Sequence, residues 1–161
     1  LRERLRDELV ELRGLIGRVV PPRLAELGLT RAIEERAELI LGVDGPALEL
    51  QLAASGEALG DRARAVALRV VEEALHNVRR HARASRVSVR SWQDDSSWSI
   101  EVRDDGCGFD PGTSGGSDGR RFGLGLMGQR ASMIDGTIAV RSRPGEGTTV
   151  TLSVPIRKEP R

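Results

Sequence analysis

Residues 61–82, "DRARAVALRVVEEALHNVRRHA", decide the class of fold, because they predict one long helix with a wide apolar face. Apolar side chains recur here at three- and four-residue spacing, the periodicity of a helix that packs one face on a core. The predicted buried stripe consists of Ala63, Val66, Ala67, Val70, Val71, Ala74, Leu75 and Val78. Asp61 is the predicted N-cap, and the helix is expected to end near Ala82.

The segments around this helix predict strands and further helices in an irregular order. Alternating apolar and polar residues predict a strand over 47–53 and two β-hairpins. The hairpin strands are expected over 85–92, 97–105, 137–143 and 148–154. Helices are expected over about 1–20, over 30–41 with Thr30 as N-cap, and over 123–134. This order predicts an α+β fold, a two-layer α/β sandwich in which helices cover one face of a mixed, mostly antiparallel sheet.

The stretch "GLGLMGQR", residues 123–130, has the G-x-G-x-x-G spelling of dinucleotide-binding folds. In those folds a strand precedes the first glycine, and the pyrophosphate binds at the N-terminus of the following helix. Residues 110–122, "DPGTSGGSDGRRF", cannot form that strand, so the sequence argues against such a fold. A loop of this kind is typical of a lid or binding loop, with a disordered linker as the alternative. If Gly123 and Gly125 open a helix, its backbone N–H groups can face an anion.

The composition limits the functions that the chain can have. Of its 161 residues 39% are apolar, enough for one folded domain, and a net charge of +1 gives no electrostatic basis for binding nucleic acid. Cys107 is the only cysteine, which excludes an internal disulfide and suits a cytoplasmic protein. Because the sequence starts at Leu1, inside a helical pattern and without Met, we expect it to be a piece of a longer protein.

Polar side chains follow the face of the 61–82 helix that lies opposite its apolar stripe. Glu73, Asn77 and His81 are spaced by four, and Arg80 lies three residues after Asn77. A carboxylate, an amide and basic groups along one face can hold hydrated Mg²⁺ and the phosphates of a nucleotide. The alternative is an ordinary solvated helix face.

A second candidate site follows the predicted strand 97–105. Asp104 or Asp105 can accept hydrogen bonds from an exocyclic amine. Gly106 and Gly108 let the backbone pass close to a flat ligand. The alternative is a simple turn at the end of a strand, although such a turn does not need two glycines.

Four motifs together resemble the boxes of the GHKL ATPases, the family of gyrase, heat-shock chaperone, histidine kinase and mismatch-repair ATPases. In chain order they are "EALHNVRRH" (73–81), "DDGCG" (104–108), "GLGL" (123–126) and "GEGT" (145–148). The resemblance covers residues 47–156 and implies the Bergerat fold. Within the family the chain is most similar to sensor histidine kinases that pair with helix-turn-helix response regulators. The G-x-G-x-x-G spelling then resembles the phosphate-side turn beneath an ATP lid.

The resemblance also implies a domain organisation and the cofactors ATP and Mg²⁺. Residues 1–29 resemble the end of a dimerisation helix and its joint, and 30–156 an ATP-binding catalytic domain with a flexible ATP lid at about 109–122. Residues 157–161 are then a C-terminal tail. By this resemblance Asn77 is the Mg²⁺ ligand, Arg80 contacts phosphate, and His81 lies near the nucleoside. Asp104 binds adenine, Gly106 and Gly108 leave room for the base, and Thr148 belongs to the adenine pocket. Gly123, Gly125 and Leu126 are residues of the ATP lid.

The implied reaction is transfer of the γ-phosphoryl group of Mg-ATP to a histidine on the dimerisation helix, for relay to a response regulator. Catalysis is expected to come mainly from positioning and charge neutralisation. The full-length kinase is expected to be a homodimer. His76 and His81 are the only histidines and both lie in the 73–81 motif, so this fragment alone is expected not to autophosphorylate. The alternatives are a GHKL ATPase or a serine kinase with Glu73 as general base, and a module that only binds ATP.

Overall fold

The sheet has one parallel and three antiparallel strand pairs. The computed structural model describes residues 21–112 and 119–156. Its strands are β1 (Ala47–Leu52), β2 (Arg86–Gln93), β3 (Ser97–Asp104), β4 (Thr137–Ser142) and β5 (Thr148–Pro155). They are ordered β1-β2-β3-β5-β4, with β1 parallel to β2 and every other neighbour antiparallel. The predicted mixed, mostly antiparallel sheet is confirmed.

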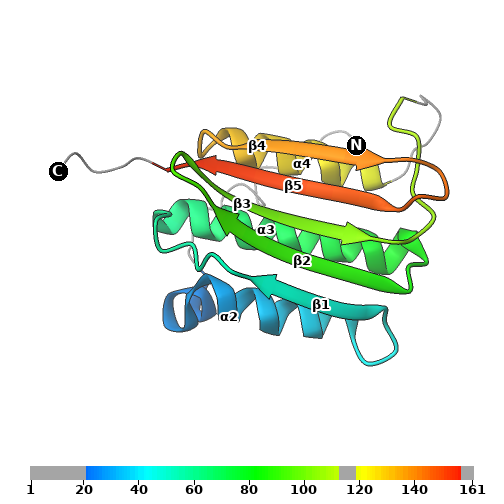
Figure 1. Cartoon of the computed structure of the whole chain (residues 1–161), viewed down its shortest axis with the longest axis horizontal. Helices are drawn as coiled ribbons and strands as arrows, with labels where there is room; N and C mark the ends of the chain where they lie inside the picture. Colours follow the sequence, from blue (N-terminus) through cyan, green and yellow to red (C-terminus); the bar gives the residue numbers. More distant parts are fainter. Residues whose placement is uncertain (1–20, 113–118, 157–161) are drawn as a thin grey trace, which may run out of the picture.

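The helices lie together on one face of this sheet (Figure 1). They are α2 (Pro22–Leu41), α3 (Asp61–Asn77), its π-helical continuation η1 (Val78–Ala82) and α4 (Gly119–Ser132). In Figure 1, α3 lies behind the middle of the sheet, with α2 on the β1 side and α4 behind β4 and β5. The predicted two-layer α+β sandwich is therefore confirmed. Within the described part of the chain, no helix is both long and apolar enough to cross a membrane.

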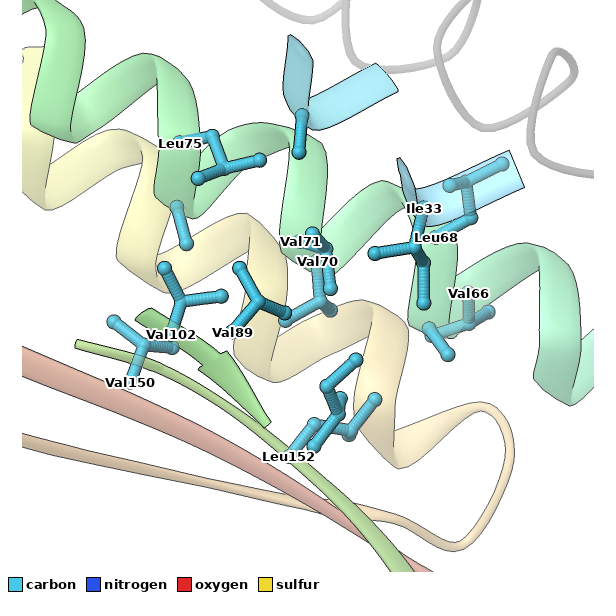
Figure 2. Packing of buried hydrophobic residues seen from close by; sticks show 14 of the residues in the cluster. Ile33, Val66, Leu68, Val70, Val71, Leu75, Val89, Val102, Val150 and Leu152 are labelled. Atoms are coloured by element: carbon cyan, nitrogen blue, oxygen red, sulfur yellow. The ribbon is translucent and has the colours of Figure 1, made fainter. Parts of the chain in front are cut away.

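Helix α3 is the centre of the hydrophobic core. Every residue of its predicted apolar stripe is buried except Ala63, which is half-buried. Leu68, outside the predicted stripe, is buried too, and Figure 2 shows it beside Ile33 of α2. Full burial of one such side chain contributes about 1.5–3 kcal/mol. The core therefore holds α3, and the polar residues at its C-terminal end, in a fixed position on the sheet.

Helix α2 begins earlier than the sequence predicts. α2 consists of two helices merged across a kink at Gly28, and the second of them agrees with the predicted helix over 30–41, although Thr30 lies just inside it and is not its N-cap. Proline suits the first helical position, where no N–H is needed. Gly28, with a φ of 75°, interrupts α2 close to the expected domain boundary between residues 29 and 30. The helix predicted over 1–20 lies outside the described residues.

The ends of α3 also differ in detail from the prediction. Gly60, not Asp61, is the N-cap, and Asp61 is the first helical residue. The Asp61 carboxylate pairs with the Arg64 guanidinium at 3.2 Å. The helical conformation reaches Ala82 as predicted, but its last five residues form the π-helical turn η1, a rare geometry that is frequent at functional sites.

Helix α4 begins four residues before the predicted start at Gly123. Its first residue is Gly119, within the segment that was expected to be a flexible lid. A glycine inside a helix costs about 1 kcal/mol relative to alanine. The complete burial of Met127 and of Ala131 against the core offsets this cost, which the local sequence does not reveal. Residues 113–118 of the expected lid lie outside the described part.

An ion-pair network joins α2 to α3. The Glu72 side chain is only 9% exposed, and its Oε1 accepts a hydrogen bond from Arg36 Nε of α2 at 2.6 Å. Its Oε2 accepts one from Arg69 at 2.9 Å. Because both carboxylate oxygens have a charged partner, Glu72 can be buried without an uncompensated charge.

Replacing Glu72 with alanine is expected to lower the free energy of unfolding by about 1–3 kcal/mol, because two charge-assisted hydrogen bonds are lost at once. Urea unfolding followed by circular dichroism measures the change. The control is Glu34→Ala, which removes an ion pair with the largely exposed Arg31 at 2.8 Å and is expected to change stability much less. Equal losses in the two variants would contradict a special role of the buried pair.

Candidate functional site

A pocket opens between the C-terminal end of α3, η1, and the adjoining ends of β3 and β5. Its empty volume is about 410 Å³, part of which is open to solvent. The lining residues are Ala74, Asn77, Val78, His81, Ala82, Val102, Asp104, Gly108, Phe109, Leu124, Thr148 and Val150. Five predicted site residues, Asn77, His81, Asp104, Gly108 and Thr148, are therefore brought together in one place.

The two aspartates at the end of β3 lie in different environments. Asp104 is buried and lines the pocket, and its Oδ1 accepts a hydrogen bond from the Gly106 N–H at 2.8 Å. The Asp105 carboxylate accepts hydrogen bonds from the Ser85 hydroxyl and from the N–H groups of Ser85 and Arg86. The Ser85 hydroxyl, followed by the Arg86 N–H, holds the pKa of Asp105 below its usual value. Only Asp104 is therefore placed to meet a ligand in the pocket.

Thr148 lies directly opposite Asp104 in the antiparallel pair of β3 and β5. Two residues further along, Val102 lies opposite Val150 in the same pair. Because residues two apart in a strand share a face, all four side chains lie on the helix-covered side of the sheet. Figure 2 shows Val102 and Val150 side by side beneath α3. The pocket thus combines a carboxylate and a hydroxyl with an apolar wall, an arrangement typical of sites for small heterocyclic ligands.

Gly106 and Gly108 allow the protein's own backbone segments to meet beside the pocket. A Cβ on Gly106 would collide with the carbonyl oxygen of Ala82, which also accepts a hydrogen bond from the Cys107 N–H at 2.7 Å. Gly108 has a φ of 57°, and a Cβ there would collide with the carbonyl oxygen of Arg143. The two glycines therefore bring the turn after β3 against η1 and the β4–β5 turn.

Asn77, Arg80 and His81 lie where α3 passes into η1. Asn77 and His81 are half-buried and both line the pocket, as their spacing of four predicts. Arg80 is exposed and is not among the lining residues. Its contact with phosphate therefore stays a prediction.

Glu73 faces α4 rather than the pocket. A Cβ on Gly123 would collide with Oε1 of Glu73, so the backbone of α4 rests directly on this carboxylate. Gly123 is buried in the second turn of α4, and the prediction that it opens this helix is wrong because α4 begins at Gly119. Gly125, two residues on, is exposed, and beyond the backbone of its own helix no described atom lies within 4 Å of a Cβ added there.

Gly123→Ala and Gly125→Ala are expected to change stability in opposite directions. The added methyl group at Gly123 must displace Glu73 or α4, which lowers the free energy of unfolding by about 1–3 kcal/mol. At Gly125 it meets open space and removes a flexible glycine from a helix, which stabilises by about 0.5–1 kcal/mol. Chemical denaturation of both variants measures the two changes, and a loss of the same size in both would contradict the Glu73 contact.

Several pocket residues were not predicted from the sequence. Phe109 follows Gly108 directly, and Leu124 stands between the two glycines of "GLG". Leu126, which the family resemblance points to, is half-buried but does not line the pocket. Strand alternation could have identified one more lining residue, Val102, because it lies two residues before Asp104 and therefore on the same face of β3.

Residues 63–158 match the family of histidine kinase-, DNA gyrase B- and HSP90-like ATPases. The signal transduction histidine-protein kinase/phosphatase DegS of Brevibacillus brevis is 30% identical over 99% of this chain and 40% of its own length. UhpB of Salmonella typhimurium, described in the same words, is 35% identical over 91% of this chain and 28% of its own. The oxygen sensor histidine kinase NreB of Staphylococcus carnosus is 30% identical over 94% of this chain and 47% of its own length. The chain thus spans less than half the length of these relatives.

Solved structures of histidine kinases share the fold. The blue-light activated histidine kinase of Erythrobacter litoralis EL346 gives a TM-score of 0.66 at 23% identity, over 80% of this chain and 42% of that one. The mycobacterial sensor histidine kinase MprB gives a TM-score of 0.62 at 20% identity, over 83% of this chain and 99% of that one. The fold predicted from the four motifs is therefore confirmed. The chain belongs to the family of histidine kinase-, DNA gyrase B- and HSP90-like ATPases, and the pocket beside Asp104 lies in its ATP-binding domain.

Proposed function

We propose that this chain is the catalytic domain of a sensor histidine kinase, which transfers the γ-phosphoryl group of Mg-ATP to a histidine on an upstream dimerisation helix. The observation that carries the proposal is the buried carboxylate of Asp104 in a largely apolar pocket, opposite the hydroxyl-bearing Thr148. The names of the relatives support the same reaction, since all of those described above are histidine kinases.

The pocket fits the base of ATP. Val102, Val150 and Leu124 offer apolar surface for a flat ring, while Asp104 and Thr148 can bond its polar edge. A carboxylate has room for about four hydrogen bonds, so Asp104 can accept one from the adenine amine in addition to that from the Gly106 N–H. A donor on the ligand is favourable here, because buried polar groups are costly without hydrogen bonds.

Asn77 fits a role in holding Mg²⁺ beside the phosphates. Its amide oxygen is a ligand of the type that Mg²⁺ prefers, and this ion usually keeps several waters and takes its remaining ligands from substrate phosphates. When bound, Mg²⁺ supplies charge neutralisation at the phosphates. Asn77 lines the same pocket as Asp104, so one nucleotide can contact both residues.

The residues of the chain then position the nucleotide rather than react with it. Phosphoryl transfer depends mainly on orientation and on stabilisation of negative charge. Asp104 and Thr148 hold the base, Asn77 orients the phosphate end, and the exposed guanidinium of Arg80 contributes positive charge near it. His81 lies beside Asn77 in the lining, next to the expected position of the nucleoside.

A second function, hydrolysis of ATP by a water molecule that Glu73 activates, has one observation in its favour. Glu73 lies one helical turn before Asn77 on α3, while its carboxylate lies against Gly123 of α4 and outside the pocket lining. A serine kinase with the same general base is a variant of this second function.

The proposal also assigns the partners of the chain. These are ATP, the dimerisation and phosphoacceptor helix of the parent kinase, and a response regulator that receives the phosphoryl group. The parent kinase is expected to be a homodimer. This domain is expected to lie in the cytoplasm. Nucleic acid is not among the expected partners, since the net charge of the chain is only +1.

The test is to incubate the protein, extended by its upstream helical segment, with γ-³²P-labelled ATP and Mg²⁺. We expect a protein-bound label that is stable in alkali and lost in acid, as the N–P bond of phosphohistidine requires. An acid-stable label would indicate a serine kinase, and release of labelled inorganic phosphate without protein labelling would indicate an ATPase. Either of these results would contradict the proposed transfer to histidine.

A further inference from the structure

We infer that Ser142 sets the base specificity of the pocket, because it fixes the direction of the hydrogen bond made by the Thr148 hydroxyl. The inference rests on the proposed function, since it concerns the recognition of adenine. Ser142 is the last residue of β4 and does not line the pocket itself. It lies opposite Thr148 of β5, which lies opposite Asp104 of β3, so the three residues form one row across the sheet.

The hydroxyl of Ser142 makes three contacts. Its Oγ accepts a hydrogen bond from the Phe109 N–H at 2.9 Å and donates one to the carbonyl oxygen of Gly147 at 3.0 Å. Oγ1 of Thr148 lies 2.9 Å from the same oxygen. Phe109 and Thr148 both line the pocket, so Ser142 connects two parts of the pocket wall from behind.

The number of hydrogens determines which hydroxyl donates. A serine hydroxyl has one hydrogen and two lone pairs. A carbonyl oxygen only accepts, so all three contacts are hydrogen bonds at the same time only when the hydrogen of Ser142 is directed to Gly147. The lone pairs of Ser142 then receive the Phe109 N–H and the hydroxyl hydrogen of Thr148. Thr148 has used its only hydrogen in this bond, and toward a ligand its oxygen can act only as an acceptor.

Asp104 and Thr148 therefore present two acceptors next to each other. The 6-amino group of adenine has two hydrogens and can donate to such a pair. The 6-oxo group of hypoxanthine or guanine is an acceptor and would face lone pairs, leaving buried polar atoms unpaired. The pocket should thus select purines with a 6-amino group, and Ser142 is a positioning residue for this choice.

A second pair of hydroxyl groups in the same sheet provides a matched control. Ser99 of β3 lies opposite Ser153 of β5, and their Oγ atoms are 2.9 Å apart. Neither residue lines the pocket. Ser153→Ala therefore removes the same kind of bond between strands without a connection to Thr148.

The test compares the binding of ADP and IDP, which differ at position 6 of the base and in the adjacent N1 proton. Calorimetric titrations use the wild-type protein, Ser142→Ala and Ser153→Ala. We expect the wild type to prefer ADP and Ser153→Ala to retain this preference. Ser142→Ala should reduce the preference about tenfold, because Thr148 can then donate to the 6-oxo group. In a Thr148→Val background, Ser142→Ala should have no further effect on the preference, since Ser142 acts through Thr148.

An unchanged preference in Ser142→Ala, or an equal loss of affinity for both nucleotides, would overturn the inference. If the alanine variant does not fold, Ser142→Cys retains a group of similar shape with a weaker acceptor, and an unchanged ADP preference there would overturn it as well. Failure of the wild-type protein to bind ADP would contradict the proposed function itself. A wild-type preference for ADP that survives in Ser142→Ala leaves the proposed function standing and overturns only the role of Ser142.

Discussion

Asp104→Asn is expected to lower the affinity for ATP by about 10- to 100-fold while changing the affinity for GTP far less. Asparagine keeps one oxygen that can accept the hydrogen bond from the Gly106 N–H, so the turn after β3 is retained. Its amide NH₂, however, is a donor where the adenine amine requires an acceptor. Displacement of a fluorescent nucleotide by ATP and by GTP measures both affinities.

The matched control for this variant is the neighbouring residue. The Asp105 carboxylate accepts hydrogen bonds from Ser85 and Arg86, away from the pocket lining, so Asp105→Asn is expected to leave the ATP affinity unchanged. A loss in Asp105→Asn as large as that in Asp104→Asn would indicate a general disturbance of the turn. An equal loss of ATP and GTP binding in Asp104→Asn would contradict base recognition by this carboxylate.

Asn77→Ala is expected to reduce phosphotransfer about 100-fold or more without unfolding the domain. The substitution removes the amide oxygen proposed to hold Mg²⁺ at the phosphates, while the half-buried position at the end of α3 tolerates a smaller side chain. Asn77→Asp is expected to abolish transfer as well. The labelling assay measures transfer, and titrations with and without Mg²⁺ should show that the metal no longer strengthens nucleotide binding.

His76→Ala serves as the control for the Asn77 variants. His76 lies in the same helical turn and is also half-buried, but it does not line the pocket. We therefore expect its transfer rate and its Mg²⁺ dependence to match those of the wild type. Normal transfer by Asn77→Ala in the protein with its upstream helix would exclude the proposed metal ligand.

Local sequence patterns predicted most of the fold. The apolar stripe of α3 and the alternation in β2, β3, β4 and β5 are signals that depend only on neighbouring residues, and the structure confirms these elements to within a few residues. The polar row on α3 was predicted for the same reason, because a spacing of four places Asn77 and His81 on one helix face whatever the rest of the chain does.

The parts that failed depend on contacts between distant segments. Gly119 begins a helix where local composition favours a loop, and burial of side chains such as Met127 decides the outcome. The choice between Asp104 and Asp105 is likewise made by Ser85, some twenty residues earlier in the chain. The register that places Thr148 opposite Asp104 joins strands far apart in sequence, so the four motifs indicated the site while spacing alone could not give its geometry.

The most direct test of the ATP-binding pocket is a calorimetric titration of this chain with a non-hydrolysable ATP analogue and with the corresponding GTP analogue, each with and without Mg²⁺. We expect saturable binding of one ATP analogue per chain, stronger with Mg²⁺ and much weaker for the GTP analogue. No binding by the folded chain, or equal binding of the two analogues, would contradict an adenine-specific nucleotide site beside Asp104.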